Sequence, residues 1–98
     1  MSTFKIKKVE DDIRIKFNNY KIIIDRDSLS KKELIKFKNC PEKNKYVESQ
    51  RVTYLKLQIY NDKGYISFSG GDSYDTEYKI TKNEMNELIQ ELIKYVNN

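Results

Sequence analysis

The side chains that most often carry catalysis are nearly missing from this sequence. The chain has no histidine and a single cysteine, Cys40. A general base would therefore have to be a carboxylate, or a lysine or tyrosine whose pKa is shifted by burial or neighbouring charge. A reactive thiolate also needs an activating base or a helix N-terminus beside it. No spacing in the chain indicates such a centre, so we predict no catalytic residues and a protein that is not an enzyme.

One segment carries oxygen-rich side chains that could suit a cation. Residues 70–75 read Gly-Gly-Asp-Ser-Tyr-Asp, and their carboxylate and hydroxyl oxygens are ligands of the kind that Ca²⁺ takes. The segment lacks the ligand number and order of an EF-hand loop. Its glycines match neither a phosphate-binding loop nor a dinucleotide fingerprint. We expect a polar connection here, with no metal and no cofactor.

A group of tyrosines suits binding rather than chemistry. Tyr54 and Tyr60 fall on the outward side of a predicted strand together with Lys56, and Tyr65 follows the next turn. Flat aromatic side chains can stack on unpaired bases while lysines contact phosphates. They suit a protein interface equally well, because tyrosine adds a large contact area at a small entropic cost. We predict that these four residues form a binding surface.

The whole chain has a net charge of +4, and its basic residues are concentrated in the first half. Residues 1–50 carry 13 basic and 8 acidic side chains, whereas residues 51–98 carry 6 and 7. Clustered cations neutralise phosphates and release counterions. The predicted cluster comprises Lys31, Lys32, Lys36 and Lys38. AT-rich coding also raises the content of Lys, Asn, Ile and Tyr, and it is the favoured explanation of the positive charge; it indicates a low-GC bacterium, a phage or a virus.

The first half of the chain predicts three strands and a short helix. Apolar and polar residues alternate between residues 4 and 24 with the period of half-buried strands, which predicts an antiparallel meander. The positions facing away from its apolar side include Lys5, Lys7, Arg14 and Lys16. Ser30 and Glu33 have the spacing of a capping box, which predicts a helix over 31–38.

The second half predicts further strands and a long helix. The polar stretch 39–51 is expected to be an irregular surface connection. Alternation predicts strands over 52–60, 65–69 and 77–80. A second capping box opens the C-terminal helix. One apolar stripe runs along that helix and should pack on the sheet; its residues are Met85, Leu88, Ile89, Leu92, Ile93 and Val96.

The segment 77–85, followed by the amphipathic helix, resembles the strand-to-helix ending of the small transcriptional-coactivator family. Members of that family bind single-stranded DNA as dimers. The resemblance covers about the last twenty residues of the chain. It implies single-stranded nucleic acid as a partner and leaves homodimer formation open.

Together these patterns predict one α+β domain over residues 1–98, with a mostly antiparallel sheet of five or six strands. The long C-terminal helix and the shorter helix should pack on one face. The single cysteine and the absence of a signal-peptide pattern favour the cytoplasm, or the host cytoplasm for a phage or viral protein. The longest apolar run, residues 22–24, is far below the roughly 20 residues that span a bilayer, so no membrane partner is expected.

The favoured function is a small protein-binding module without enzymatic activity. Phages and mobile elements encode such modules to inhibit a host or toxin protein. The alternative is a single-stranded nucleic-acid-binding protein that uses the tyrosine-bearing sheet face and the basic first half.

Overall fold

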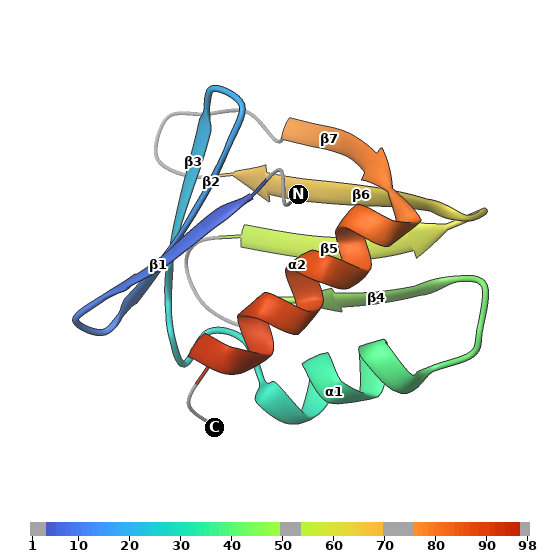
Figure 1. Ribbon diagram of the computed structural model, residues 1–98, viewed down its shortest axis with the longest axis horizontal. Coiled ribbons are helices and arrows are strands. Elements are labelled where there is room, and N and C mark those ends of the chain that lie inside the picture. The colour runs from blue at the N-terminus through green and yellow to red at the C-terminus, as the bar shows by residue number, and fades with distance from the viewer. Residues whose placement is uncertain (1–3, 50–53, 70–75, 97–98) are drawn as a thin grey trace.

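A computed structural model describes residues 4–49, 54–69 and 76–96, which form two antiparallel sheets and two helices (Figure 1). The three-stranded sheet has the order β1 (Lys5–Val9), β2 (Asp12–Phe17), β3 (Tyr20–Asp25). The four-stranded sheet has the order β4 (Lys45–Glu48), β5 (Tyr54–Tyr60), β6 (Lys63–Ser69), β7 (Thr76–Thr81). The helices are α1 (Lys31–Asn39) and α2 (Lys82–Tyr95). The prediction of a small α+β domain is confirmed.

The prediction of one sheet with five or six strands is wrong, because the strands divide into sheets of three and four. In Figure 1 the three-stranded sheet crosses one end of the four-stranded sheet at a steep angle. This arrangement lets the apolar faces of both sheets point at the same core. Alternation shows which face of a strand is buried, but it does not show which strands share hydrogen bonds.

The predicted irregular connection over 39–51 contains a strand, β4, which is a second correction. Strand β4 is an edge strand that pairs with β5, and Val47 lies opposite Leu57. Val47 is its one buried residue. A single apolar position gives no detectable period, so the pairing with β5 rather than local alternation defines this strand.

Both sheets and both helices contribute to one core. The inward residues of β5, which are Leu55, Leu57 and Ile59, are at most 1% exposed. Helix α2 lies across the inner face of β5, β6 and β7 (Figure 1). Its apolar stripe is buried as predicted, with Ile93 partly exposed at the margin. Helix α1 packs against α2 and β4.

Each helix begins at the capping residue that the sequence predicted, Ser30 for α1 and Thr81 for α2. The Ser30 hydroxyl accepts a hydrogen bond from the Glu33 amide at the start of α1. At the start of α2, Thr81 and Glu84 form both bonds of a capping box. These bonds satisfy amide groups that have no partner within the helix.

A cluster of aromatic rings joins the two sheets. The Phe17 ring of β2 lies 6.1 Å from the Phe68 ring of β6 and 5.1 Å from the Tyr78 ring of β7, between ring centres. Tyr20 of β3 contacts the same two rings, and the Asn18 amide donates a hydrogen bond to the Tyr78 hydroxyl. These contacts fix the directions in which the outer faces of the two sheets point.

Candidate functional site

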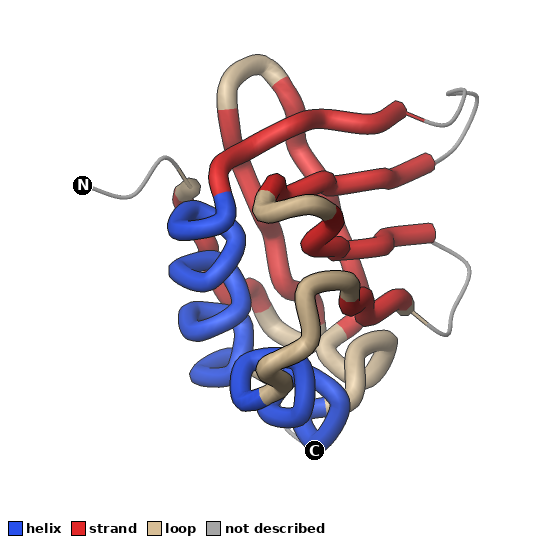
Figure 2. Tube along the Cα trace, turned by 90° about the vertical axis from the view of Figure 1, so that its right-hand side faces the viewer, coloured by secondary structure: helices blue, strands red, loops and turns tan. Residues whose placement is uncertain are grey.

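The outer face of the four-stranded sheet carries the predicted tyrosines. Because Leu55, Leu57 and Ile59 point into the core, the alternate residues of β5 point outward. Four tyrosines and three lysines point outward from this sheet, and we call the surface that they form the outer tyrosine face. Its residues are Tyr46, Tyr54, Tyr60, Tyr65, Lys56, Lys63 and Lys79. Figure 2 shows this sheet with helix α2 on its opposite side.

Cross-strand register sets the neighbours on this face. Tyr46 lies opposite Gln58, which in turn lies opposite Tyr65. Tyr60 lies opposite Lys63, next to the turn that joins β5 and β6. The sequence predicted a turn over 61–64, but Asn61 and Asp62 alone form it, with φ of 51° and 62°. This tight turn brings Lys63 into β6 and onto the outer tyrosine face.

The tyrosines differ in exposure and frame shallow depressions. Tyr46 is 59% exposed and Tyr60 is 47% exposed, whereas Tyr54 and Tyr65 are half-buried. The Lys56 ammonium lies 4.7 Å from the centre of the Tyr46 ring, a cation–π contact. One depression of about 270 Å³ is lined by Gln58, Tyr60, Tyr65 and Glu77. A second, of about 290 Å³, is lined by Tyr54, Lys56, Gln58, Ser67, Thr76 and Glu77.

Two lysines converge on one side of this face. Lys79 of β7 lies opposite Tyr65, and Lys63 lies opposite Thr81. The pKa of Lys79 is lower than that of an ordinary lysine. The largest cause is a hydrogen-bond interaction with the Lys63 side chain, followed by repulsion from the Lys63 charge, and burial contributes least. Two neighbouring ammonium groups repel each other unless an anion lies between them. The pair therefore suits a carboxylate or a phosphate.

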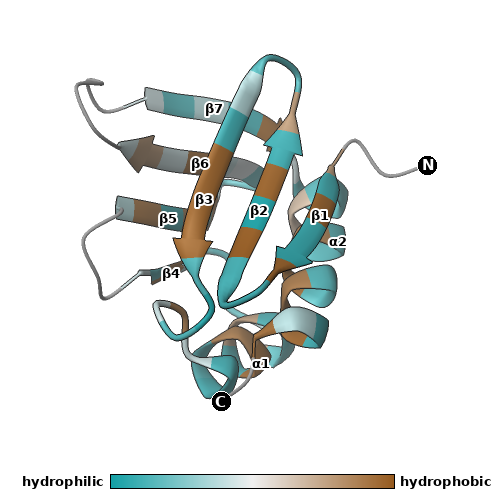
Figure 3. Cartoon of the chain, turned by 90° about the vertical axis from the view of Figure 1, so that its left-hand side faces the viewer, coloured by the Kyte–Doolittle hydropathy of each residue, from teal (hydrophilic) through white to brown (hydrophobic). Residues whose placement is uncertain are grey.

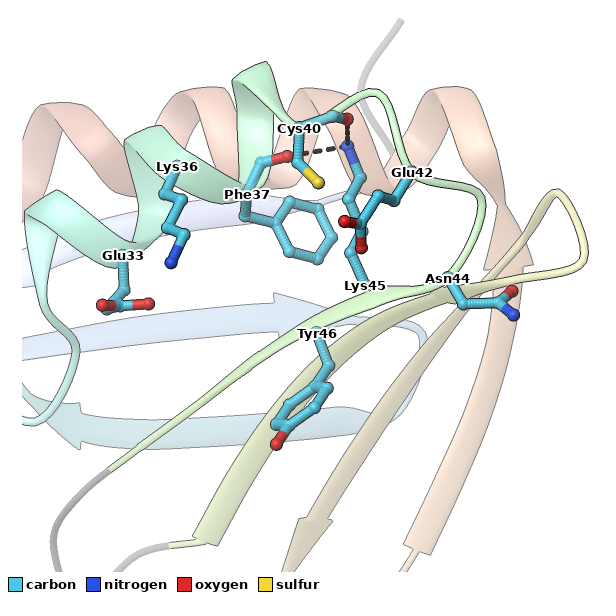
Figure 4. Close-up of a pocket in the computed structure, with 8 residues that line it drawn as sticks. All are labelled: Glu33, Lys36, Phe37, Cys40, Glu42, Asn44, Lys45 and Tyr46. Atoms are coloured by element: carbon cyan, nitrogen blue, oxygen red, sulfur yellow. Dashed lines mark hydrogen bonds between the residues drawn. The ribbon is translucent and has the colours of Figure 1, made fainter.

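Only one of the four helix lysines lies beside the outer tyrosine face. Leu34 and Phe37 form the buried side of α1, and the predicted lysines lie away from it. Lys36 and Tyr46 both line a cavity of about 240 Å³ between α1 and β4 (Figure 4). Lys31, Lys32 and Lys38 do not line this cavity. Among the lysines of the predicted basic cluster, Lys36 alone therefore shares a cavity with a residue of the outer tyrosine face, and that residue is Tyr46 rather than one of the predicted tyrosines.

The same cavity contains a lysine with a structural role. The Lys45 ammonium donates hydrogen bonds to the carbonyl oxygens of Phe37, at 2.7 Å, and Cys40, at 2.9 Å. It also lies 4.8 Å from the centre of the Phe37 ring. Figure 4 shows these groups together with the Cys40 thiol, which is half-buried. Lys45 thus holds the C-terminal end of α1 against β4.

Sequence reasoning missed three residues of the surface: Tyr46, Lys63 and Lys79. Tyr46 lies in the stretch predicted to be irregular, and its place on this face follows from the pairing of β4 with β5. Lys63 was assigned to a turn. Lys79 lies in a predicted strand, but its position beside Lys63 depends on the pairing of β6 with β7.

The candidate cation segment 70–75 lies outside the described residues. Within the described part of the chain, no group of three or more His, Cys, Asp or Glu side chains is placed to hold a metal ion. Neither described helix combines the length and the apolar character needed to cross a membrane. Comparison with protein families, curated proteins and solved structures finds no match for this chain.

Proposed function

We propose that this protein is a binding module without catalytic activity and that its outer tyrosine face binds a protein partner. The observation that supports this most is the presence of four tyrosines on the outside of a sheet whose inside is fully packed. Residues that a core does not need, and that offer large aromatic area to solvent, are typical of interface hot spots.

The surface is also suited to binding without large rearrangement. Strands β5 and β6, which carry Tyr54, Tyr60 and Tyr65, are the two central strands of the sheet. Each is hydrogen-bonded on both sides, so the backbone beneath the tyrosines is already ordered before binding. A preorganised surface loses less conformational entropy when a partner docks.

The charges on the surface favour a partner with carboxylate groups among its contacts. Lys63 and Lys79 provide the converging pair, and Lys56 lies beside Tyr46. We propose that the module occludes part of a host or toxin protein in the cytoplasm, as an inhibitor does. Charge complementarity would guide the encounter, and the tyrosines would provide most of the affinity.

Single-stranded nucleic acid is the second candidate partner. Its support is the cation–π contact between Lys56 and Tyr46, which places an ammonium group beside an exposed ring. Glu48 and Glu77 lie on the same sheet face, flanking Lys56 and Ser67 in one cross-strand row. Their carboxylates would repel a phosphate backbone, so a protein partner is preferred.

The test is a triple variant, Tyr54→Ser, Tyr60→Ser and Tyr65→Ser, used for affinity capture from cells that express the chain. The wild-type chain should retain a discrete partner, and the triple variant should lose it while its melting temperature changes little. The matched control is Ile35→Ser, which removes an exposed apolar side chain from α1 and should retain the partner. Retention of the partner by the triple variant would contradict the proposal.

Two further measurements separate the alternatives. Sedimentation of the purified chain tests whether the occupant of the outer tyrosine face is a second copy. Mobility of labelled single strands across a salt series tests nucleic acid, because such binding weakens steeply as salt rises.

A further inference from the structure

The outer face of the three-stranded sheet carries five cations in two adjacent rows that run across β1, β2 and β3. Alternation with the buried residues of β2 turns five basic side chains outward, and we call them the basic sheet face: Lys5, Lys7, Arg14, Lys16 and Lys21. Figure 3 shows this sheet toward the viewer, with hydrophilic and hydrophobic positions alternating along β2 and β1 mostly hydrophilic. The sequence placed four of these residues on one face, and the structure adds Lys21.

Register arranges these cations in rows across the strands. Lys5 lies opposite Lys16, which lies opposite Lys21. In the next row, Lys7 lies opposite Arg14, which lies opposite Ile23. Like charges directly opposite each other on adjacent strands destabilise a sheet. The arrangement therefore carries an electrostatic cost that an anionic partner would offset.

No described residue forms an ion pair with these five cations. The salt bridges among residues 4–49, 54–69 and 76–96 involve Arg26, Lys82 and Lys94, and none involves the basic sheet face. The Nε atom of Arg14 is buried and has no hydrogen-bond partner among the described residues. Asp12 and Asp25 lie opposite each other on the same face, one row beyond Lys7 and Arg14, and form no ion pair with the five cations.

We propose that the basic sheet face binds the phosphate backbone of double-stranded nucleic acid. Successive outward residues are separated by about 7 Å along a strand and about 5 Å between strands, which gives a flat array of cations. A duplex presents one negative charge per about 1.7 Å of its axis, so it can meet several of these cations at once.

The absence of aromatic residues from the basic sheet face favours a duplex over a single strand. Proteins that bind single strands provide rings on which bases stack, whereas the apolar residue in these two rows is Ile23, which is 42% exposed. Contacts to phosphates alone carry no sequence information. Binding should therefore be independent of sequence. This surface is distinct from the outer tyrosine face, so the inference goes beyond the proposed function.

The test is fluorescence anisotropy with a labelled duplex of arbitrary sequence, measured from 50 to 200 mM salt. If all five cations contact phosphates, the slope of log K against log salt should be about −4.5, and affinity should fall about 500-fold over this range. The variant Lys16→Gln with Lys21→Gln should make the slope shallower by about 1.8. Its control is Lys32→Gln with Lys38→Gln on α1, which changes the net charge equally and should leave the slope unchanged.

Several outcomes would overturn the inference. The inference is wrong if the duplex does not bind at 50 mM salt, if both double variants lose affinity equally, or if single strands bind more tightly than the duplex. Equal binding of polyglutamate or of vesicles containing anionic lipid would instead assign the face to an acidic protein or a membrane surface. The tyrosine triple variant should bind the duplex normally, so failure here and failure of the proposed function are distinguishable.

Discussion

Replacing Lys45 with methionine should loosen the end of helix α1 without changing any binding surface. The Lys45 ammonium donates two hydrogen bonds to carbonyl oxygens at this helix end, those of Phe37 and Cys40. Methionine keeps an unbranched apolar stem that can still pack on the Phe37 ring, so the change removes little except the ammonium group. The loss therefore measures what these two bonds, together with the contact between the ammonium group and the Phe37 ring, contribute to folding.

The magnitude follows from the number and setting of the bonds. A hydrogen bond to a charged group contributes about 1.5 to 3 kcal/mol. Lys45 is only half-buried, so water competes for its ammonium, and we expect about 2 kcal/mol for the pair of bonds together. For a domain of this length, that loss lowers the melting temperature by about 8 to 16 °C.

Thermal and urea unfolding, followed by circular dichroism, would measure this change. The control is Lys43→Met, because Lys43 lies in the same connection, is exposed and forms no hydrogen bond or ion pair with a described residue. It should melt within about 4 °C of the wild type, since surface changes typically stay within about 0.5 kcal/mol. Equal melting of both variants would refute the structural role assigned to Lys45.

Three further changes test the core and the converging lysines. Leu92→Ala empties a fully buried position and should cost about 2 to 5 kcal/mol in urea unfolding; wild-type stability would show that the stripe on α2 is not core. Gly64→Ala places a methyl group 2.8 Å from Ile80 Cγ1, so it should cost about 1 to 3 kcal/mol, and an unchanged melting temperature would contradict this packing. Lys63→Gln should raise the pKa of Lys79, observable by NMR titration, because it removes the ammonium group whose hydrogen-bond interaction and charge lower that pKa. In the wild type, the pKa of Lys79 is lower in the folded chain than in the unfolded chain, where it is 10.5. The free energy of unfolding should therefore rise with pH between these two pKa values, because the unfolded chain binds more protons there. The variant should lose this rise.

Local patterns were sufficient to predict most individual elements. The capping box at Thr81 and the apolar stripe on α2 predicted the longest helix, because both signals depend on residues within a few turns of each other. Alternation over β5 predicted that Tyr54 and Tyr60 face outward. These features need no knowledge of which strands are neighbours.

Features that depend on contacts between distant segments could not be predicted. The division into two sheets depends on how the aromatic cluster around Phe17 packs against β6 and β7. Strand β4 exists because it pairs with β5, and its own sequence contains one buried residue. The convergence of Lys63 and Lys79 likewise requires the register of β6 with β7. Of the predicted helix lysines, the packing of α1 brings only Lys36 to a cavity that Tyr46 also lines.

Photo-crosslinking from the outer tyrosine face tests the central claim most directly. Benzoylphenylalanine would replace Tyr60, which is 47% exposed on this face, and in a parallel sample Glu87, which is exposed on α2 on the other side of the sheet. Irradiation in cells that express the chain should yield one discrete crosslinked protein from position 60 and none from position 87. Crosslinking of the same protein from position 87 alone, or equally from both positions, would contradict the assignment of the outer tyrosine face as the binding surface.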